Sequence, residues 1–189
     1  MPESLPLIPL RGLVMFPGML LHFDAGRDRS IAALNHAMDK GKEILLVTQK
    51  DIRVEDPKGE DIYEIGCTAK IRQMLKVNDS EVKVLVEGGK RVFIHRIIEA
   101  QKFHIGEFTE VLPKGIRANA LYKEAAIRHL KALFEDYAAV APRLPNNVVM
   151  TIRATNSLSF ISDFIASNLP FPVEDKQLIL EEDSPLKRV

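Results

Sequence analysis

The sequence predicts an α+β chain, with a bent β-sheet or pseudo-barrel and one helix in residues 1–114 and a helical bundle in residues 115–189. Short apolar runs with strand-like alternation, separated by turn residues, fill residues 43–112. One stretch with helical spacing, residues 28–41, interrupts this region. After Pro113-Lys114-Gly115 the apolar residues follow the helical period. Several strands with a single helix and short turns favour a strongly bent sheet in the first part.

The segment Leu5–Arg27 is rich in apolar residues but is interrupted too often to form one helix. The interruptions are Pro6, Pro9, Gly12, Pro17 and Gly18. Since a membrane helix needs about 20 consecutive apolar residues, we expect no membrane span. The pattern predicts strands near Leu5–Leu10 and Met19–Phe23. The loop between them carries Met15 and Phe16, whose side chains either cover the core or bind a partner.

A helix is expected after these two strands. Asp28 can cap it and Gly41 is a natural stop. Its buried face, at helical spacing, contains Ile31, Leu34 and Met38.

Five further strands follow this helix. They are expected at Glu43–Thr48, Gly66–Lys76, Glu81–Glu87, Arg91–Ala100 and Phe103–Leu112. The turn Asn78-Asp79-Ser80 makes a hairpin of the second and third, and Gly88-Gly89 is expected to turn the chain again. The alternation that begins at Cys67 loses phase at Met74–Leu75, which indicates a bulge or sharp bend.

The second half of the chain predicts four helices. The longest, Ala118–Ala141, ends at Pro142 and carries the apolar stripe Ile127, Leu130, Phe134 and Tyr137. The other three are a short helix capped by Asn146 or Asn147 and running to Thr155, a helix from Ser157 or Ser159 to Pro170, and Glu174–Glu182.

The last residues have the pattern of one more helix start. Ser184 would be the cap and Pro185 the first helical residue. A domain seldom ends on a helix that has just begun, so we expect the N-terminal part of a longer polypeptide.

Composition narrows the class of protein. Lys+Arg and Asp+Glu both total 26, and the resulting zero net charge argues against nucleic-acid binding, which usually relies on a basic excess. No signal peptide is visible at Met1. The single cysteine, Cys67, excludes an internal disulfide, fits a reducing cytoplasm and is expected to be a small buried side chain.

The sequence contains no recognisable catalytic motif. It lacks a phosphate-binding loop, a Gly-x-Ser-x-Gly elbow and a His-Glu-x-x-His helix. Its five histidines are scattered and none has a metal-ligand spacing to another His or Cys. We therefore expect no catalytic residue, no metal and no cofactor in this chain.

Several segments together resemble one family. They are Leu7-Ile8-Pro9-Leu10-Arg11-Gly12 with Phe16-Pro17-Gly18, Gly26-Arg27-Asp28-Arg29-Ser30, Ile65-Gly66-Cys67-Thr68-Ala69-Lys70-Ile71 with Gln73, Val86-Glu87-Gly88 with Arg91, Asp163-Phe164-Ile165-Ala166-Ser167, and Asp175-Lys176-Gln177-Leu178-Ile179-Leu180-Glu181. Each is short, but their order and spacing resemble the N-terminal, substrate-engaging domain of the ATP-dependent Lon protease.

This resemblance implies a PUA-like β-domain followed by a helical subdomain. It implies a cytoplasmic, homo-hexameric protease whose ATPase module, with ATP and Mg²⁺, and Ser-Lys protease module would lie beyond residue 189. The chain itself would neither hydrolyse ATP nor cleave peptide bonds. Its partners would be unfolded, damaged or degron-bearing proteins, which it would deliver to the ATPase.

A receptor for unfolded chains needs exposed apolar surface. With Val82, Val84 and Val86 facing inward, Leu85 would face outward between charged neighbours. Met74 and Leu75 lie across the same hairpin, and one of them is expected to share the face of Leu85. The full set of candidate substrate-binding residues is Leu85, Met74, Leu75, Met15, Phe16 and Leu21. Packing in the core is the alternative for each.

Three other functions stay open at this stage. One is a mainly structural module that brings protomers together through the helical half. Another is an RNA-binding PUA-like protein, against which the zero net charge argues. The third is a stand-alone family member without protease modules.

Overall fold

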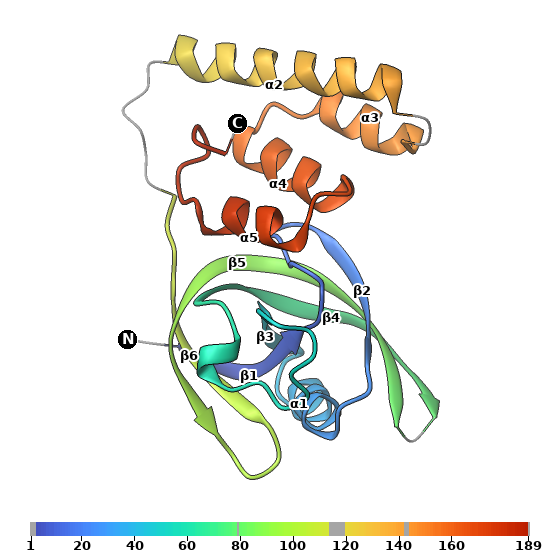
Figure 1. The fold of residues 1–189 in the computed structure, drawn as a ribbon, viewed down its shortest axis with the longest axis vertical. Helices are drawn as coiled ribbons and strands as arrows, with labels where there is room; N and C mark the ends of the chain where they lie inside the picture. The colour runs from blue at the N-terminus through green and yellow to red at the C-terminus, as the bar shows by residue number, and fades with distance from the viewer. Residues whose placement is uncertain (1–2, 79, 114–119, 142–143, 189) are drawn as a thin grey trace. The chain divides into compact units, whose positions relative to one another are not determined.

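The computed structural model describes residues 3–78, 80–113, 120–141 and 144–188. The chain forms two compact units, Met1–Leu112 and Pro113–Val189 (Figure 1). Four predicted features lie outside the described residues: the middle of the turn at Asp79, the break at Lys114-Gly115, the helix start at Ala118 and the helix stop at Pro142. No helix in the described ranges is long and apolar enough to cross a membrane.

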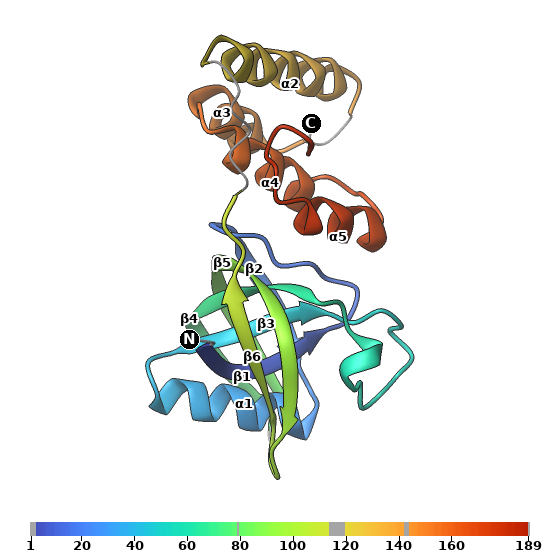
Figure 2. The ribbon, with the colours of Figure 1, turned by 90° about the vertical axis from the view of Figure 1, so that its left-hand side faces the viewer.

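The first unit contains one mixed sheet of six strands. They are β1 (Glu3–Leu10), β2 (Leu20–Ala25), β3 (Glu43–Thr48), β4 (Ile65–Asn78), β5 (Glu81–Glu99) and β6 (His104–Glu110). The order is β2-β5-β4-β3-β1-β6, and only the β1–β3 pair is parallel. The second half of β5 also pairs with β6, so the sheet closes on itself (Figure 2). The predicted combination of sheet and helices is confirmed at this level.

The core of the first unit lies inside this closed sheet. It contains the buried side chains of Leu7, Leu45, Val47, Ile62, Val92, Ile94 and Phe108. The predicted buried strand Glu43–Thr48 is confirmed, since every residue after Glu43 in β3 is at most 1% exposed. Cys67 is fully buried, as expected. The helix α1 (Asp28–Asp39) packs on β1 and β3, and a 3-10 turn, η1, spans Gly59–Asp61.

The sequence predicted the C-terminal end of α1 correctly but not its N-terminal cap. Asp28 is not the cap, because the extended residue before the helix is Arg27 and Asp28 is the first helical residue. Its carboxylate instead lies at the positive end of the helix dipole. Gly41 does end the helix: its φ is +104°, and the N–H of Lys42 donates to the carbonyl of Ala37 at 2.7 Å. This is the Schellman pattern that favours glycine.

The hairpin of β4 and β5 has the irregularity that the sequence indicated. The register shifts between Ile71, which pairs with Val86, and Gln73, which pairs with Leu85. Arg72 is the extra residue of this bulge. Before Arg72 the inward side chains of β4 are at odd-numbered positions, and after it they are at even-numbered positions. This explains the loss of phase at Met74–Leu75.

The prediction of a turn at Gly88-Gly89 is wrong. The strand β5 runs without a break through both glycines. A Cβ on Gly88 would lie 2.1 Å from the carbonyl oxygen of Phe16, and one on Gly89 would lie 2.7 Å from Thr68 Oγ1. These glycines therefore allow neighbouring chain segments to approach a continuous strand closely, which is the other common reason for glycine in a strand.

The second unit contains four helices in its described part. They are α2 (Ala120–Val140), α3 (Asn146–Ala154), α4 (Leu158–Asn168) and α5 (Val173–Glu181). A cluster of buried side chains joins the first three, formed by Phe134, Val148, Ile152, Ile161 and Leu169. Ile127 and Leu130 pack on this cluster as predicted, but Tyr137 is 38% exposed and Ala138 packs in its place. Ala138 is four residues after Phe134 and so lies on the same helix face.

Of the caps predicted for α3 and α4, only the one for α4 is confirmed. Ser157 caps α4, with its Oγ accepting from the N–H of Phe160 at 3.4 Å. Neither Asn146 nor Asn147 caps α3, because the residue before the helix is Pro145 and Asn146 is already helical. The carbonyl of Pro145 accepts from the N–H of Val148 at 2.9 Å.

After α5 the chain makes a single turn at Pro185–Lys187. The predicted capping role of Ser184 is wrong, since its buried hydroxyl makes no hydrogen bond. Arg188 holds this segment instead. Its guanidinium donates to the carbonyl of Glu182 at 2.6 Å and to the carboxylate of Asp163 at 3.2 Å.

Candidate functional site

The outer face of β2, β5 and β4 brings together three leucines from three neighbouring strands. Strand register places Leu20 opposite Glu87, and Leu75 opposite Lys83. Leu85 lies between Glu87 and Lys83 on the same face of β5. The three leucines therefore follow one diagonal across the sheet, each a diagonal neighbour of the next, at about 7–8 Å between Cα atoms. We call Leu20, Leu85 and Leu75 the leucine stripe.

The leucine stripe is accessible to solvent. Leu20 is 65% exposed and Leu75 is 56% exposed, while Leu85 between them is partly buried. The alternation predicted for the central strand is confirmed, because Val82, Val84 and Val86 are all buried. The outward Leu85 thus has an outward leucine as a diagonal neighbour on each side, unlike the isolated exposed leucine that is common on protein surfaces.

Charged and polar side chains border the leucine stripe. Glu87 accepts from Arg72 Nε at 2.6 Å in an ion pair across β4 and β5. Asp24 is directly opposite Lys83, and His22 is directly opposite Leu85. Such a polar border around an apolar centre is the usual arrangement of a protein-binding surface.

Two candidates from the sequence lie on the inner side of the same strands. Met74 pairs with the buried Val84, and Leu21 pairs with the buried Val86. Both are partly buried. The bulge at Arg72 therefore assigns Leu75, and not Met74, to the face of Leu85.

Met15 and Phe16 belong to the core, which corrects their inclusion among the surface candidates. They are 2% and 1% exposed. Their loop is attached to β5 by two backbone hydrogen bonds, from Gly18 N–H to the Gly88 carbonyl at 2.9 Å and from Gly88 N–H to the Met19 carbonyl at 2.8 Å. Because Gly88 has no side chain, the loop can lie directly on the strand.

The sequence reasoning missed Leu20. A signal for it was present, because in β2 the buried Phe23 and Ala25 place Leu21 inward and Leu20 outward. The sequence prediction instead grouped Leu21 with the loop residues Met15 and Phe16 and did not use the alternation of the strand Met19–Phe23. No group of three His, Cys, Asp or Glu side chains in the described part of the chain could hold a metal ion.

Comparisons with known proteins give the family of the chain. Residues 4–189 match the model of the ATP-dependent protease La (LON) substrate-binding domain. Lon protease 3 of Sorangium cellulosum is 36% identical over 97% of this chain, and Lon protease of Syntrophomonas wolfei is 38% identical over 99% of it. The chain spans 22% and 23% of the length of these two relatives.

The fold is also found in solved structures. The N-terminal domain of Mycobacterium avium complex Lon protease superposes with a TM-score of 0.75 at 19% identity, covering 98% of this chain and 94% of that one. The Lon N-terminal domain protein from Xanthomonas campestris superposes with a TM-score of 0.68 at 16% identity, with the same two coverages. With a family model matched over nearly its whole length, this chain belongs to the family of Lon substrate-binding domains.

Proposed function

We propose that this chain recognises unfolded, damaged or degron-bearing proteins through the leucine stripe. The observation that carries the proposal is the diagonal of Leu20, Leu85 and Leu75 across three strands, with the two outer leucines more than half exposed. Unfolded chains expose apolar side chains that folded chains bury. A shallow apolar stripe on a rigid sheet can take many such side chains without selecting one sequence.

Binding of this kind is expected to be weak. Full burial of one leucine contributes about 1.5–3 kcal/mol, and a flexible partner loses conformational freedom when it is ordered. Three leucines that are each only partly covered therefore support micromolar to millimolar dissociation constants. Weak binding suits a receptor that must pass its substrate on.

An NMR titration with an unfolded model protein tests the proposal. We expect amide shifts in β2, β4 and β5, and we expect Leu20→Lys and Leu75→Lys each to reduce the affinity several-fold. The matched control is Leu178→Lys, since Leu178 lies in α5 and is 64% exposed, almost as much as Leu20. Shifts confined to the helical unit, or equal losses in the control, would contradict the proposal.

A structural role of the helical unit is the second candidate. Leu121, Leu133 and Val140 of α2 are all more than half exposed, which suits a contact between protomers. Leu133→Lys separates the two candidates. A change in sedimentation equilibrium with unchanged substrate binding favours assembly through α2. No change in either measurement favours recognition alone, and lost substrate binding would contradict recognition through the leucine stripe.

We further propose the setting in which recognition takes place. The first unit is PUA-like, the second is a helical bundle, and both serve a hexameric, cytoplasmic, ATP-dependent serine protease that works in protein quality control and stress response. The Lon relatives, which are more than four times as long, support this setting. Nucleic acid is not a partner in this proposal, because the net charge is zero, and absence of salt-sensitive RNA binding is the expected result.

A further inference from the structure

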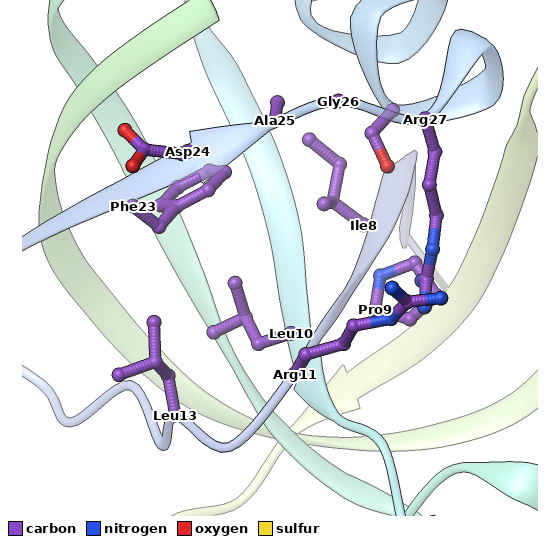
Figure 3. Close-up of a pocket in the computed structure, with 11 residues that line it drawn as sticks. Ile8, Pro9, Leu10, Arg11, Leu13, Phe23, Asp24, Ala25, Gly26 and Arg27 are labelled. Carbon is purple, nitrogen blue, oxygen red and sulfur yellow. The ribbon is translucent and has the colours of Figure 1, made fainter. Parts of the chain in front are cut away.

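A cavity of about 430 Å³ lies in the first unit, between the end of β1, the residues after it, β2 and the start of α1. Its volume falls within the range of about 300–1,000 Å³ typical of ligand sites. One part of the wall is apolar, where Ile8, Leu10 and Phe23 are each at most 8% exposed. Another part is cationic, formed by Arg11 and Arg27 (Figure 3).

The two arginines lie close together in the cavity wall. Arg11 Nη2 and Arg27 Nη2 donate to the same oxygen, the carbonyl of Val54, at 3.3 and 3.2 Å. Arg27 Nη2 also donates to Gln49 Oε1 at 2.8 Å. Figure 3 shows the two side chains ending beside each other near Pro9.

This pair of like charges is incompletely compensated. Burial lowers the pKa of Arg27, and the charge of Arg11 lowers it further. Glu55 and Asp56 act in the opposite direction and more weakly. Within the described ranges no carboxylate is within ion-pair distance of either guanidinium, and both bind protein acceptors through Nη2 alone. Their other N–H groups can therefore donate to an added anion.

Supporting the Val54 loop is the simpler role for these arginines. This role explains the hydrogen bonds that the two Nη2 groups donate. It does not explain why two cations meet at one carbonyl, or why a cavity with an apolar wall lies beside them. Asp24, which Figure 3 places away from the arginines, also lines the cavity. The carboxylate of Asp24 belongs to the outer face of β2, where Asp24 is opposite Lys83. The rest of the lining, two cations beside an apolar wall, favours a ligand with a negative group and an apolar body.

We propose that the cavity binds a peptide segment in which a carboxylate, held by Arg11 and Arg27, adjoins a bulky apolar side chain that packs on Ile8, Leu10 and Phe23. The inference rests on the proposed function, because it adds a chemical class of substrate to the recognition of unfolded chains. A chain end and an acidic side chain both supply this carboxylate. Guanidinium groups bind carboxylates through strong, charge-assisted hydrogen bonds.

Three short peptides test the inference on the whole 189-residue chain by NMR. They are N-acetyl-Gly-Gly-Leu with a free C-terminal carboxylate, the same peptide as its amide, and N-acetyl-Leu-Asp-Gly-amide, whose only carboxylate is a side chain. We expect shifts at Leu13, Phe23 and Gly26 with at least one of the two acids, and loss on amidation. The acid that binds more tightly identifies the source of the carboxylate.

Substitutions locate the binding. Arg11→Gln is expected to weaken it about tenfold at low salt, the loss of one charge-assisted hydrogen bond. Arg11 is exposed and makes one long bond in the structure, so this variant should fold. The control Arg128→Gln removes an exposed arginine of α2 and should leave binding unchanged. Arg11→Lys keeps the positive charge but loses the bidentate donor geometry of the guanidinium, so it should bind with intermediate affinity.

Several outcomes overturn the inference. These are equal binding of acid and amide, unchanged binding in Arg11→Gln, or tighter binding of inorganic phosphate or an RNA oligonucleotide at the same residues. Failure of the proposed function looks different, since an unfolded protein would then shift no residue of the leucine stripe. Conversely, if Leu75→Lys abolishes binding of unfolded protein and no acid peptide binds, only the cavity inference fails.

Discussion

At the scale of single residues, Gly88 determines which apolar side chains are available. The carbonyl oxygen of Phe16 lies only 2.1 Å from the place that a Cβ of residue 88 would take. This contact, with the two backbone hydrogen bonds beside it, buries Met15 and Phe16, so neither side chain is available at the surface.

A substitution at Gly88 tests this role. Gly88→Ala should destabilise the first unit by about 1–3 kcal/mol, the usual cost of overpacking, because the obstructing atom belongs to the backbone. Urea denaturation followed by intrinsic fluorescence or circular dichroism measures the change. Gly59→Ala is the control, since its Cβ would meet only Ile97 Cδ1, at 3.9 Å. Equal midpoints for both variants would show that the loop yields freely.

Arg188 is the second residue on which much structure depends. Its side chain and that of Asp163 are 0% and 4% exposed and form an ion pair at 3.2 Å. Arg188→Met leaves a buried carboxylate with less compensation, so we expect a loss of about 3–5 kcal/mol in the stability of the second unit. Thermal unfolding measures it, with the exposed neighbour Lys187→Met as control.

The companion variant separates charge from packing. Combining Arg188→Met with Asp163→Leu should recover part of the stability, because replacing a whole buried pair costs less than removing one member. A double variant as unstable as the sum of the single ones would contradict this explanation.

At the scale of elements, strand periodicity decides which side chains share a face. The bulge at Arg72 resets that periodicity within β4, and it is the reason that Leu75, three residues later, joins Leu85 and Leu20. A single extra residue in one strand thus brings leucines of three neighbouring strands onto one face of the sheet.

His104, at the start of β6, lies close to charged residues of α1 and of the loop before η1. Its titration should make the stability of the first unit depend on pH. Its Nε2 is 3.2 Å from Arg29 Nη1 of α1, and Asp56 lies 3.8 Å away. Burial, followed by the charge of Arg29, lowers the pKa of His104 from its ordinary value of 6.5, while Asp56 and Glu99 act in the opposite direction. The native state therefore takes up this proton at a lower pH than the unfolded chain does.

The expected result is lower stability in acid. Well above pH 6.5 both states are neutral at His104, and as the pH falls through that value the unfolded state gains a proton first. Unfolding should then become easier, by at most about 1.4 kcal/mol per pH unit for one proton. Urea midpoints at pH 7.5 and 5.5 measure it. His104→Gln should flatten the dependence, while the exposed His129→Gln in α2 should retain it.

At the scale of the whole molecule, each unit has its own buried cluster, around Phe108 in the first and Phe134 in the second. A unit with its own core can unfold by itself. We therefore expect Gly88→Ala to lower amide protection in β1–β6 alone and Arg188→Met to lower it in α2–α5 alone. Hydrogen exchange followed by mass spectrometry measures both, and a loss of protection spread over both units in either variant would contradict independent unfolding.

Much of this architecture was predictable because it depends on local pattern. The alternation of Val82, Val84 and Val86 identified the inner face of β5. Gly41 marked the end of α1, because glycine readily adopts the positive φ that is found there. The predictions that failed concern the glycine pair Gly88-Gly89 and several helix caps. A pair of glycines in a sequence is equally typical of a turn and of a strand that another segment approaches closely. Only the close contacts with Phe16 and Thr68 in the folded chain distinguish the two.

The sequence by itself determined the element types, the order of a strand-rich part followed by helices, the hairpin with its bulge, and the family. Only the tertiary structure decided that Met15 and Phe16 are buried, that Leu20 completes the leucine stripe, and that Arg11 and Arg27 meet beside a cavity. The physical reason is the range of the interactions. Periodicity and turn preference act over a few residues, whereas exposure and charge pairing depend on chain segments that are brought together only by folding.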